Sequence, residues 1–172
     1  MRVLFLPGIF SKTVPWAEKL LTAAGEADWQ AQTRHYGHWR GENEENIDVS
    51  AELEHLRGEQ VDLLFGKSMG ALLALMAVAQ HLVSPARLIL IGVPANILHE
   101  RGIDLAGLAQ KITIPTLCIQ QTDDITGSCG ELRRLVAANP VFTINEIAGK
   151  DHQYKDMAQL TRRIKKWLAA WK

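Results

Sequence analysis

The stretch Gly66-Lys67-Ser68-Met69-Gly70 joins a short apolar run, residues 61–65, to a long apolar segment, residues 71–82. The run has the length and composition of a buried strand, and the segment is long enough for a buried helix. Where a strand turns this sharply into a helix, the central residue takes a strained backbone conformation, and side chains two positions away on either side would collide. The G-x-S-x-G pattern therefore predicts a nucleophile elbow that presents Ser68.

Six apolar or β-branched runs alternate along the chain with six segments of helical periodicity. This alternation predicts an α/β fold with a doubly wound, mostly parallel six-stranded sheet and helices on both faces. The strands at 61–65 and 87–92 should form the middle of the sheet. The predicted strands span residues 2–6, 30–35, 61–65, 87–92, 116–120 and 141–146, and the predicted helices span residues 15–24, 48–56, 69–82, 105–111, 130–138 and 153–171.

The last predicted helix has an apolar face and a basic face, and we expect it to dock on the sheet rather than lie on a membrane surface. The most polar stretch, residues 37–48, is interpreted as a surface loop that contributes to function only if it folds over the site.

Composition limits the classes of protein to which the chain can belong. Its 172 residues suffice for one packed core but not for two ordinary domains, so we predict a single domain over residues 1–172. Nineteen Lys and Arg residues balance nineteen Asp and Glu residues, which argues against nucleic acid as a partner. No apolar run reaches the roughly 20 residues that span a bilayer, and no secretion signal is evident. With only two cysteines, the chain is predicted to be cytoplasmic, and no particular oligomeric state is indicated.

Cofactor and metal sites are not predicted. His35 and His38 lie near several glutamates, but they form no recognised metal-ligand spacing. The loop at residues 6–12 has one glycine and neither a G-x-G-x-x-G nor a Walker pattern, which argues against nucleotide binding.

Two loops supply the other groups that a nucleophilic serine needs. Thr122-Asp123-Asp124-Ile125-Thr126 follows the fifth predicted strand, and Gly149-Lys150-Asp151-His152 follows the sixth. Both loops should open at the carboxyl ends of the strands, beside the elbow, where ligands bind in such sheets. A serine nucleophile requires a base to take its proton, an acid to orient that base and donors for the oxyanion. The chain order Ser, Asp, His is the order expected on this scaffold.

With these motifs in sequence order, the chain resembles a small, lidless member of the α/β-hydrolase superfamily over essentially its whole length. Leu6-Pro7-Gly8-Ile9-Phe10 resembles the family's first His-Gly-type loop, and the three motifs above resemble its elbow, acid loop and histidine loop. The resemblance implies Ser68 as nucleophile, Asp123 as acid and His152 as base. Family spacing, with Ile two residues after the acid, favours Asp123 over Asp124, which would then be a turn or cap residue.

The chain departs from the family pattern in two places. Pro7 replaces the usual histidine before Gly8, although the oxyanion donors are backbone amides, which we expect to be those of Met69 and of Ile9 or Phe10. Only residues 93–104 are available for a lid. The acyl pocket must therefore come from loop side chains, with apolar candidates Ile9, Phe10, Trp39, Met69, Val93 and Ile125.

These features predict a cofactor-independent serine hydrolase (carboxylesterase or thioesterase-like) that cleaves a small to medium ester or thioester through an acyl-enzyme. The alternative is a non-catalytic scaffold that binds a ligand or partner in the same cleft. Ser68 would then be a helix N-cap hydroxyl and His152 an ordinary loop histidine. Asp151 is interpreted as a solvated turn residue, and Lys67 is expected to reach solvent.

Overall fold

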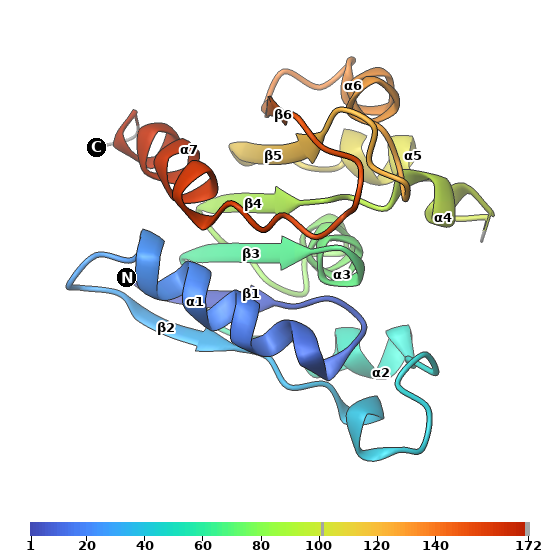
Figure 1. The fold of residues 1–172 in the computed structure, drawn as a ribbon. Coiled ribbons are helices and arrows are strands. Elements are labelled where there is room, and N and C mark those ends of the chain that lie inside the picture. Colours follow the sequence, from blue (N-terminus) through green and yellow to red (C-terminus); the bar gives the residue numbers. More distant parts are fainter. Residues whose placement is uncertain (101, 171–172) are drawn as a thin grey trace.

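Six parallel strands form one sheet in the order β2-β1-β3-β4-β5-β6. The computed structural model describes residues 1–100 and 102–170. The carboxyl ends of the strands lie together at one edge of the sheet (Figure 1). The strands are β1 (Arg2–Leu6), β2 (Gln30–Thr33), β3 (Leu63–Lys67), β4 (Arg87–Ile91), β5 (Thr116–Gln121) and β6 (Phe142–Ile147).

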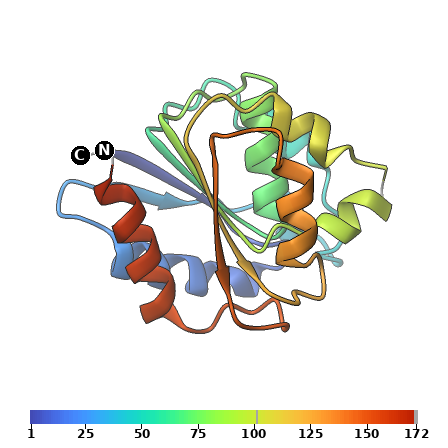
Figure 2. The same cartoon turned by 90° about the horizontal axis from the view of Figure 1, so that it is seen from above.

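Helices cover both faces of the sheet, so the predicted fold class is confirmed. Figure 2 shows α1 and α7 on one face and α3, α5 and α6 on the other. The helices are α1 (Val14–Ala24), α2 (Val49–Glu54), α3 (Met69–Ala79), α4 (Ala95–Glu100), α5 (Leu105–Gln110), α6 (Cys129–Val136) and α7 (Met157–Ala169), with short 3-10 helices η1 (Ser11–Thr13) and η2 (Gly37–Arg40). Among the described helices, none is long and apolar enough to cross a bilayer.

Two apolar clusters, one on each face, make up the core. Successive side chains of a strand point to opposite faces, so Leu63 and Phe65 join the cluster under α1 and α7 while Leu64 joins the cluster under α3. All three side chains are fully buried. This double burial explains why β3 is a continuous apolar run, and it places β3 and β4 in the middle of the sheet as predicted.

The structure differs from the sequence prediction at two elements. The last helix begins at Met157 rather than at residue 153, because the Asp156 side chain caps it by accepting a hydrogen bond from the amide of Gln159. Its apolar face packs on the sheet side as expected, whereas Trp171, the last residue of the predicted helix, lies outside the described residues. The segment 93–104, in which no helix is predicted from the sequence, contains the short helix α4.

Candidate active site

Ser68 lies in the sharp turn between β3 and α3, with φ 54° and ψ −119°. This backbone conformation is strained for a residue other than glycine. A Cβ on Gly66 would stand 2.7 Å from the Cα of Ala71, and a Cβ on Gly70 would overlap the carbonyl of Leu6. The Ser68 side chain makes no capping hydrogen bond to α3, so it does not serve as an N-cap hydroxyl.

The carboxylate that contacts His152 belongs to Asp124, so the prediction of Asp123 is wrong. Nδ1 of His152 lies 2.8 Å from Oδ2 and 2.9 Å from Oδ1 of Asp124. Asp123 is exposed, and its backbone amide donates to the carbonyl of Gly149. That bond ties the acid loop to the histidine loop and directs the side chain of Asp123 outwards and that of Asp124 inwards.

The Asp124 carboxylate is buried among donors. It accepts hydrogen bonds from the backbone amide and hydroxyl of Thr126, at 2.9 and 2.8 Å, and from the Tyr154 hydroxyl at 2.7 Å. Burial acts to raise the pKa of Asp124, but the bonds from His152, Thr126 and Tyr154 outweigh it and lower that pKa. An ionised carboxylate in this position can hold an imidazole in one orientation and stabilise its protonated form.

His152 is held through its backbone as well as its ring. Its φ of 60° is left-handed, its amide donates to Oε1 of Gln121 at 2.9 Å, and its carbonyl accepts from Nζ of Lys67 at 3.2 Å. With Nδ1 directed at Asp124, the tautomer that donates to the carboxylate leaves Nε2 as an acceptor. Nε2 is buried and has no hydrogen-bond partner among the described residues.

Ser68 and His152 both border the end of β4. The Ser68 amide donates to the carbonyl of Ile91, and a Cβ on the next residue, Gly92, would stand 3.0 Å from Cε1 of His152. No hydrogen bond joins Ser68 to Nε2 within the described residues, and long or absent hydrogen bonds of this kind are common in ligand-free sites.

The predicted oxyanion donors surround a cavity at Ser68. Ile9, Phe10 and Met69 all line this cavity, whose volume is about 270 Å³. Their amide N–H groups donate none of the hydrogen bonds found in the described residues. The Met69 amide also lies at the N-terminus of α3, where the helix dipole favours negative charge.

Residues 36–44 hold the loop that carries these donors, a role that sequence reasoning missed. The Tyr36 hydroxyl donates to the carbonyl of Pro7 at 2.9 Å, and Nε1 of Trp39 and Nε2 of His38 lie 2.7 and 2.8 Å from the carbonyl of Ile9. The run Tyr36-Gly37-His38-Trp39 was the available signal, since three side chains with N–H or O–H donors adjoin a predicted strand end. Within the described residues, no group of three His, Cys, Asp or Glu side chains could hold a metal ion.

The remaining walls of the cavity differ from the prediction. Pro94 and Ile97 close one side, and the exposed Glu45 reaches its mouth. Trp39, Val93 and Ile125 are not among the lining residues, so their assignment to the pocket is wrong. Trp39 is used to bind the Ile9 carbonyl, as described above. Val93 is fully buried with its backbone held by the Gln120 side chain, and Ile125 is 72% exposed.

Contrary to the expectation from the sequence, Lys67 does not reach solvent. Its side chain is only 6% exposed and lies against the rings of Trp16 and Tyr154, on the face of the sheet covered by α1 and α7. Asp151 is exposed, as interpreted from the sequence, and accepts a hydrogen bond from the side chain of Gln121.

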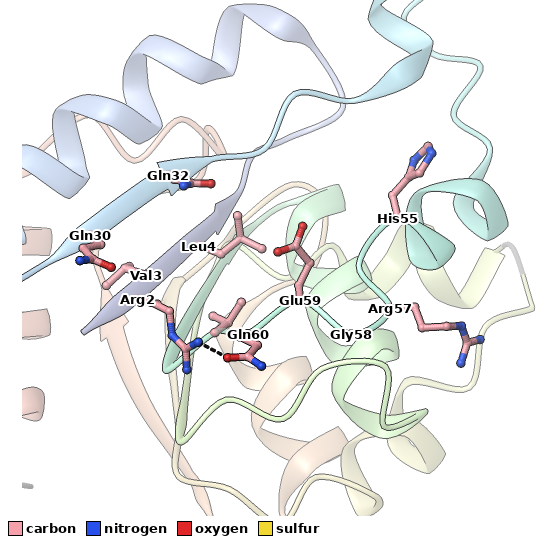
Figure 3. Close-up of a pocket in the computed structure, with 11 residues that line it drawn as sticks. Arg2, Val3, Leu4, Gln30, Gln32, His55, Arg57, Gly58, Glu59 and Gln60 are labelled. Carbon is pink, nitrogen blue, oxygen red and sulfur yellow. Dashed lines mark hydrogen bonds between the residues drawn. The ribbon is translucent and has the colours of Figure 1, made fainter.

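A larger hollow, of about 480 Å³, lies away from Ser68, between β1, β2 and the segment before β3 (Figure 3). Its arginines are already paired. Arg2 binds Asp62 and Gln60, and Arg57 binds Glu54. The strained serine lines the smaller cavity, and His152 of the buried Asp124–His152 pair approaches the same end of β4, so this region is the candidate active site.

Solved structures with this fold are similar over nearly the whole chain. Est1E from Butyrivibrio proteoclasticus has a TM-score of 0.71 and 12% identity, with 98% of this chain and 86% of that chain covered. Alpha/beta hydrolase domain-containing protein 10 from mouse has a TM-score of 0.69 and 17% identity, with coverages of 99% and 90%. A thioesterase domain from the curacin biosynthetic pathway has a TM-score of 0.62 and 14% identity, with coverages of 95% and 90%.

No protein-family model and no curated protein sequence matches the chain. At identities this low, the likeness to solved structures shows the fold alone: the chain has the α/β-hydrolase fold.

Proposed function

We propose that this α/β-hydrolase-fold chain is a serine hydrolase that cleaves a carboxylic ester or thioester through an acyl-enzyme. Ser68 is the nucleophile, His152 the general base and Asp124 the acid that orients it. The observation that carries the proposal is the buried Asp124–His152 pair with an unpartnered Nε2, which borders the end of β4 as does the serine of the strained elbow.

The proposed mechanism assigns each proton to a stated atom. Oγ of Ser68 attacks the substrate carbonyl while Nε2 of His152 takes its proton, and Asp124 stabilises the imidazolium. The negative oxygen is bound by the amides of Met69 and of Ile9 or Phe10. His152 then gives its proton to the leaving alcohol or thiol. In the second half, His152 activates the water that releases the acyl group from Ser68.

The cavity favours short to medium acyl groups. Its volume of about 270 Å³ is just below the range of about 300–1,000 Å³ that is usual for small-molecule sites. Apolar side chains from Ile9, Phe10, Met69, Pro94 and Ile97 form its walls, which suits an aliphatic acyl chain.

A non-catalytic binding role is the second candidate, because Ser68 and His152 share no hydrogen bond in the structure. On that view the cleft binds a ligand without activating the serine. The two candidates differ in one chemical property, the nucleophilicity of Ser68.

A fluorophosphonate probe measures this property directly. We expect stoichiometric labelling, with intact mass and peptide mapping placing the adduct on Ser68. The label should be lost in Ser68→Ala and His152→Ala and kept in Ser84→Ala, which changes an exposed serine outside the cavity. Hydrolysis of p-nitrophenyl esters and acyl thioesters should disappear in Ser68→Ala while its circular dichroism stays unchanged. A folded protein that takes no label would favour the binding role.

A further inference from the structure

Lys67 is the residue immediately before the proposed nucleophile, yet its side chain points away from the cavity. It continues the face of β3 formed by Leu63 and Phe65, beneath α1 and α7. Nζ lies 5.4 Å from the centre of the Trp16 ring and 5.7 Å from that of the Tyr154 ring. An ammonium group is thus enclosed by aromatic faces inside an apolar layer.

Among the described residues, Nζ makes one hydrogen bond, to the carbonyl of His152 at 3.2 Å. The charged groups facing it are Asp124 and Asp151. Burial lowers the pKa of Lys67 to about 8, and both carboxylates oppose that shift. An apolar side chain would fill the same space without this desolvation penalty, so the stability of the fold gives no reason for a lysine here.

The backbone of His152 does give a reason. A left-handed residue other than glycine persists only when its surroundings hold it, because the conformation costs of the order of 1–3 kcal/mol. The amide of His152 is held by Gln121, and its carbonyl is held by Lys67. Removing Lys67 leaves the carbonyl side of this residue unrestrained.

We propose that Lys67 is a positioning residue that ties the elbow to the histidine loop, because its ammonium group fixes the His152 carbonyl. The inference rests on the proposed function. Lys67 and Ser68 are consecutive. The Lys67 side chain and the peptide bond between these two residues therefore fix the position of the proposed base, His152, relative to the proposed nucleophile.

The test compares two variants of Lys67. Lys67→Met removes the charge and the hydrogen-bond donors while keeping most of the length of the side chain, and Lys67→Arg keeps the charge and the donors. Lys150→Met is the matched control, since Lys150 is an exposed lysine on the loop that carries His152. We expect Lys67→Met to lower kcat about tenfold with KM unchanged, because Lys67 does not line the cavity.

Lys67→Arg should retain more activity than Lys67→Met, and Lys150→Met should match the parent protein. If Lys67→Met keeps the kcat of the parent, the positioning role is overturned while the serine hydrolase stands.

A readout that needs no turnover separates this inference from the proposed function. In ¹⁵N–¹H spectra, the amide signals of His152 and Gln153 should shift or broaden in Lys67→Met and stay in place in Lys150→Met. Unchanged signals overturn the inference. Failure of the parent protein to react with a fluorophosphonate overturns the proposed function instead. Should Lys67→Met not fold, Lys67→Gln takes its place in both measurements, because it also removes the charge and its side chain is one atom shorter than that of lysine.

Discussion

At the scale of single residues, the choice between two adjacent carboxylates is set by one turn. The Asp123 amide donates to the Gly149 carbonyl, whereas the Asp124 carboxylate accepts hydrogen bonds from His152, Thr126 and Tyr154. Asp124→Asn should keep the shape of the site but favour the wrong imidazole tautomer, so we expect kcat to fall by about 10³-fold or more. Asp123→Asn is the control and should stay within about twofold, since exposed surface changes have small effects. Equal losses in both variants, measured by ester hydrolysis, would refute the assignment.

Lys67 leads to a second prediction at this scale, on how the stability of the protein depends on pH. The pKa of Lys67, about 8 in the folded chain, is below its unfolded value of about 10.4. The native state therefore binds fewer protons than the unfolded state between these values, and stability rises with pH across that window. Below pH 8, burial of the charged Lys67 lowers the free energy of unfolding by its full amount, about 3 kcal/mol, before the contacts that Lys67 makes are counted.

Lys67→Met should remove this penalty. We expect it to be more stable than the parent protein at pH 7, with the difference shrinking as pH rises from 8 to 10. Urea unfolding of both proteins at pH 7, 8, 9 and 10 measures the difference. A variant that is less stable at pH 7 and equally so at pH 10 would show that Lys67 is not penalised by burial.

At the scale of elements, α4 is a part of the cavity wall that is not among the helices predicted from the sequence. Ile97 on α4 lines the cavity, whereas Ile125 is exposed on the acid loop. Ile97→Ala should widen the acyl pocket and move the preferred ester to a longer chain. Each methylene that fills the new space contributes about 0.8 kcal/mol, a few-fold in kcat/KM. Ile125→Ala makes the same chemical change outside the cavity, and its chain-length profile on p-nitrophenyl esters should match the parent's.

The elements also show what a single sequence can and cannot predict. The strands could be assigned because residues such as Leu63, Leu64 and Phe65 are apolar on both faces, which few structures other than a central strand require. The elbow could be placed because glycines at 66 and 70 are sterically required there. Loop geometry could not be predicted, since a turn decides whether Ile125 faces the cavity or solvent.

The histidine loop is the clearest case of missing signal. His152 and Tyr154 both adopt positive φ without being glycines, and contacts from distant elements hold them there. Lys67 and Gln121 provide those contacts for His152, and Trp16 binds the carbonyl of Tyr154 at 3.1 Å. Local sequence carries no mark of such long-range hydrogen bonds, so Lys67 was expected to be solvated.

At the scale of the whole molecule, the single domain predicted from chain length remains a prediction about cooperativity. The two apolar clusters lie on opposite faces of one sheet and share its strands, so losing either cluster exposes the same backbone. Leu63 and Leu64 are adjacent, fully buried and on opposite faces. Leu63→Ala and Leu64→Ala should each lower the free energy of unfolding by about 3 to 5 kcal/mol within one transition.

Two probes can follow this transition on both faces. Trp16 and Trp29 pack against the cluster under α1 and α7, and Trp39 packs against the other cluster, so tryptophan fluorescence reports both. In a single cooperative unit, fluorescence and far-UV circular dichroism trace one coincident curve in the parent protein and both variants, because the shared sheet cannot lose one layer alone. If the faces were independent, Leu63→Ala would shift only part of the fluorescence change and leave a second step at the original midpoint. That outcome would replace the single domain with two separately unfolding layers.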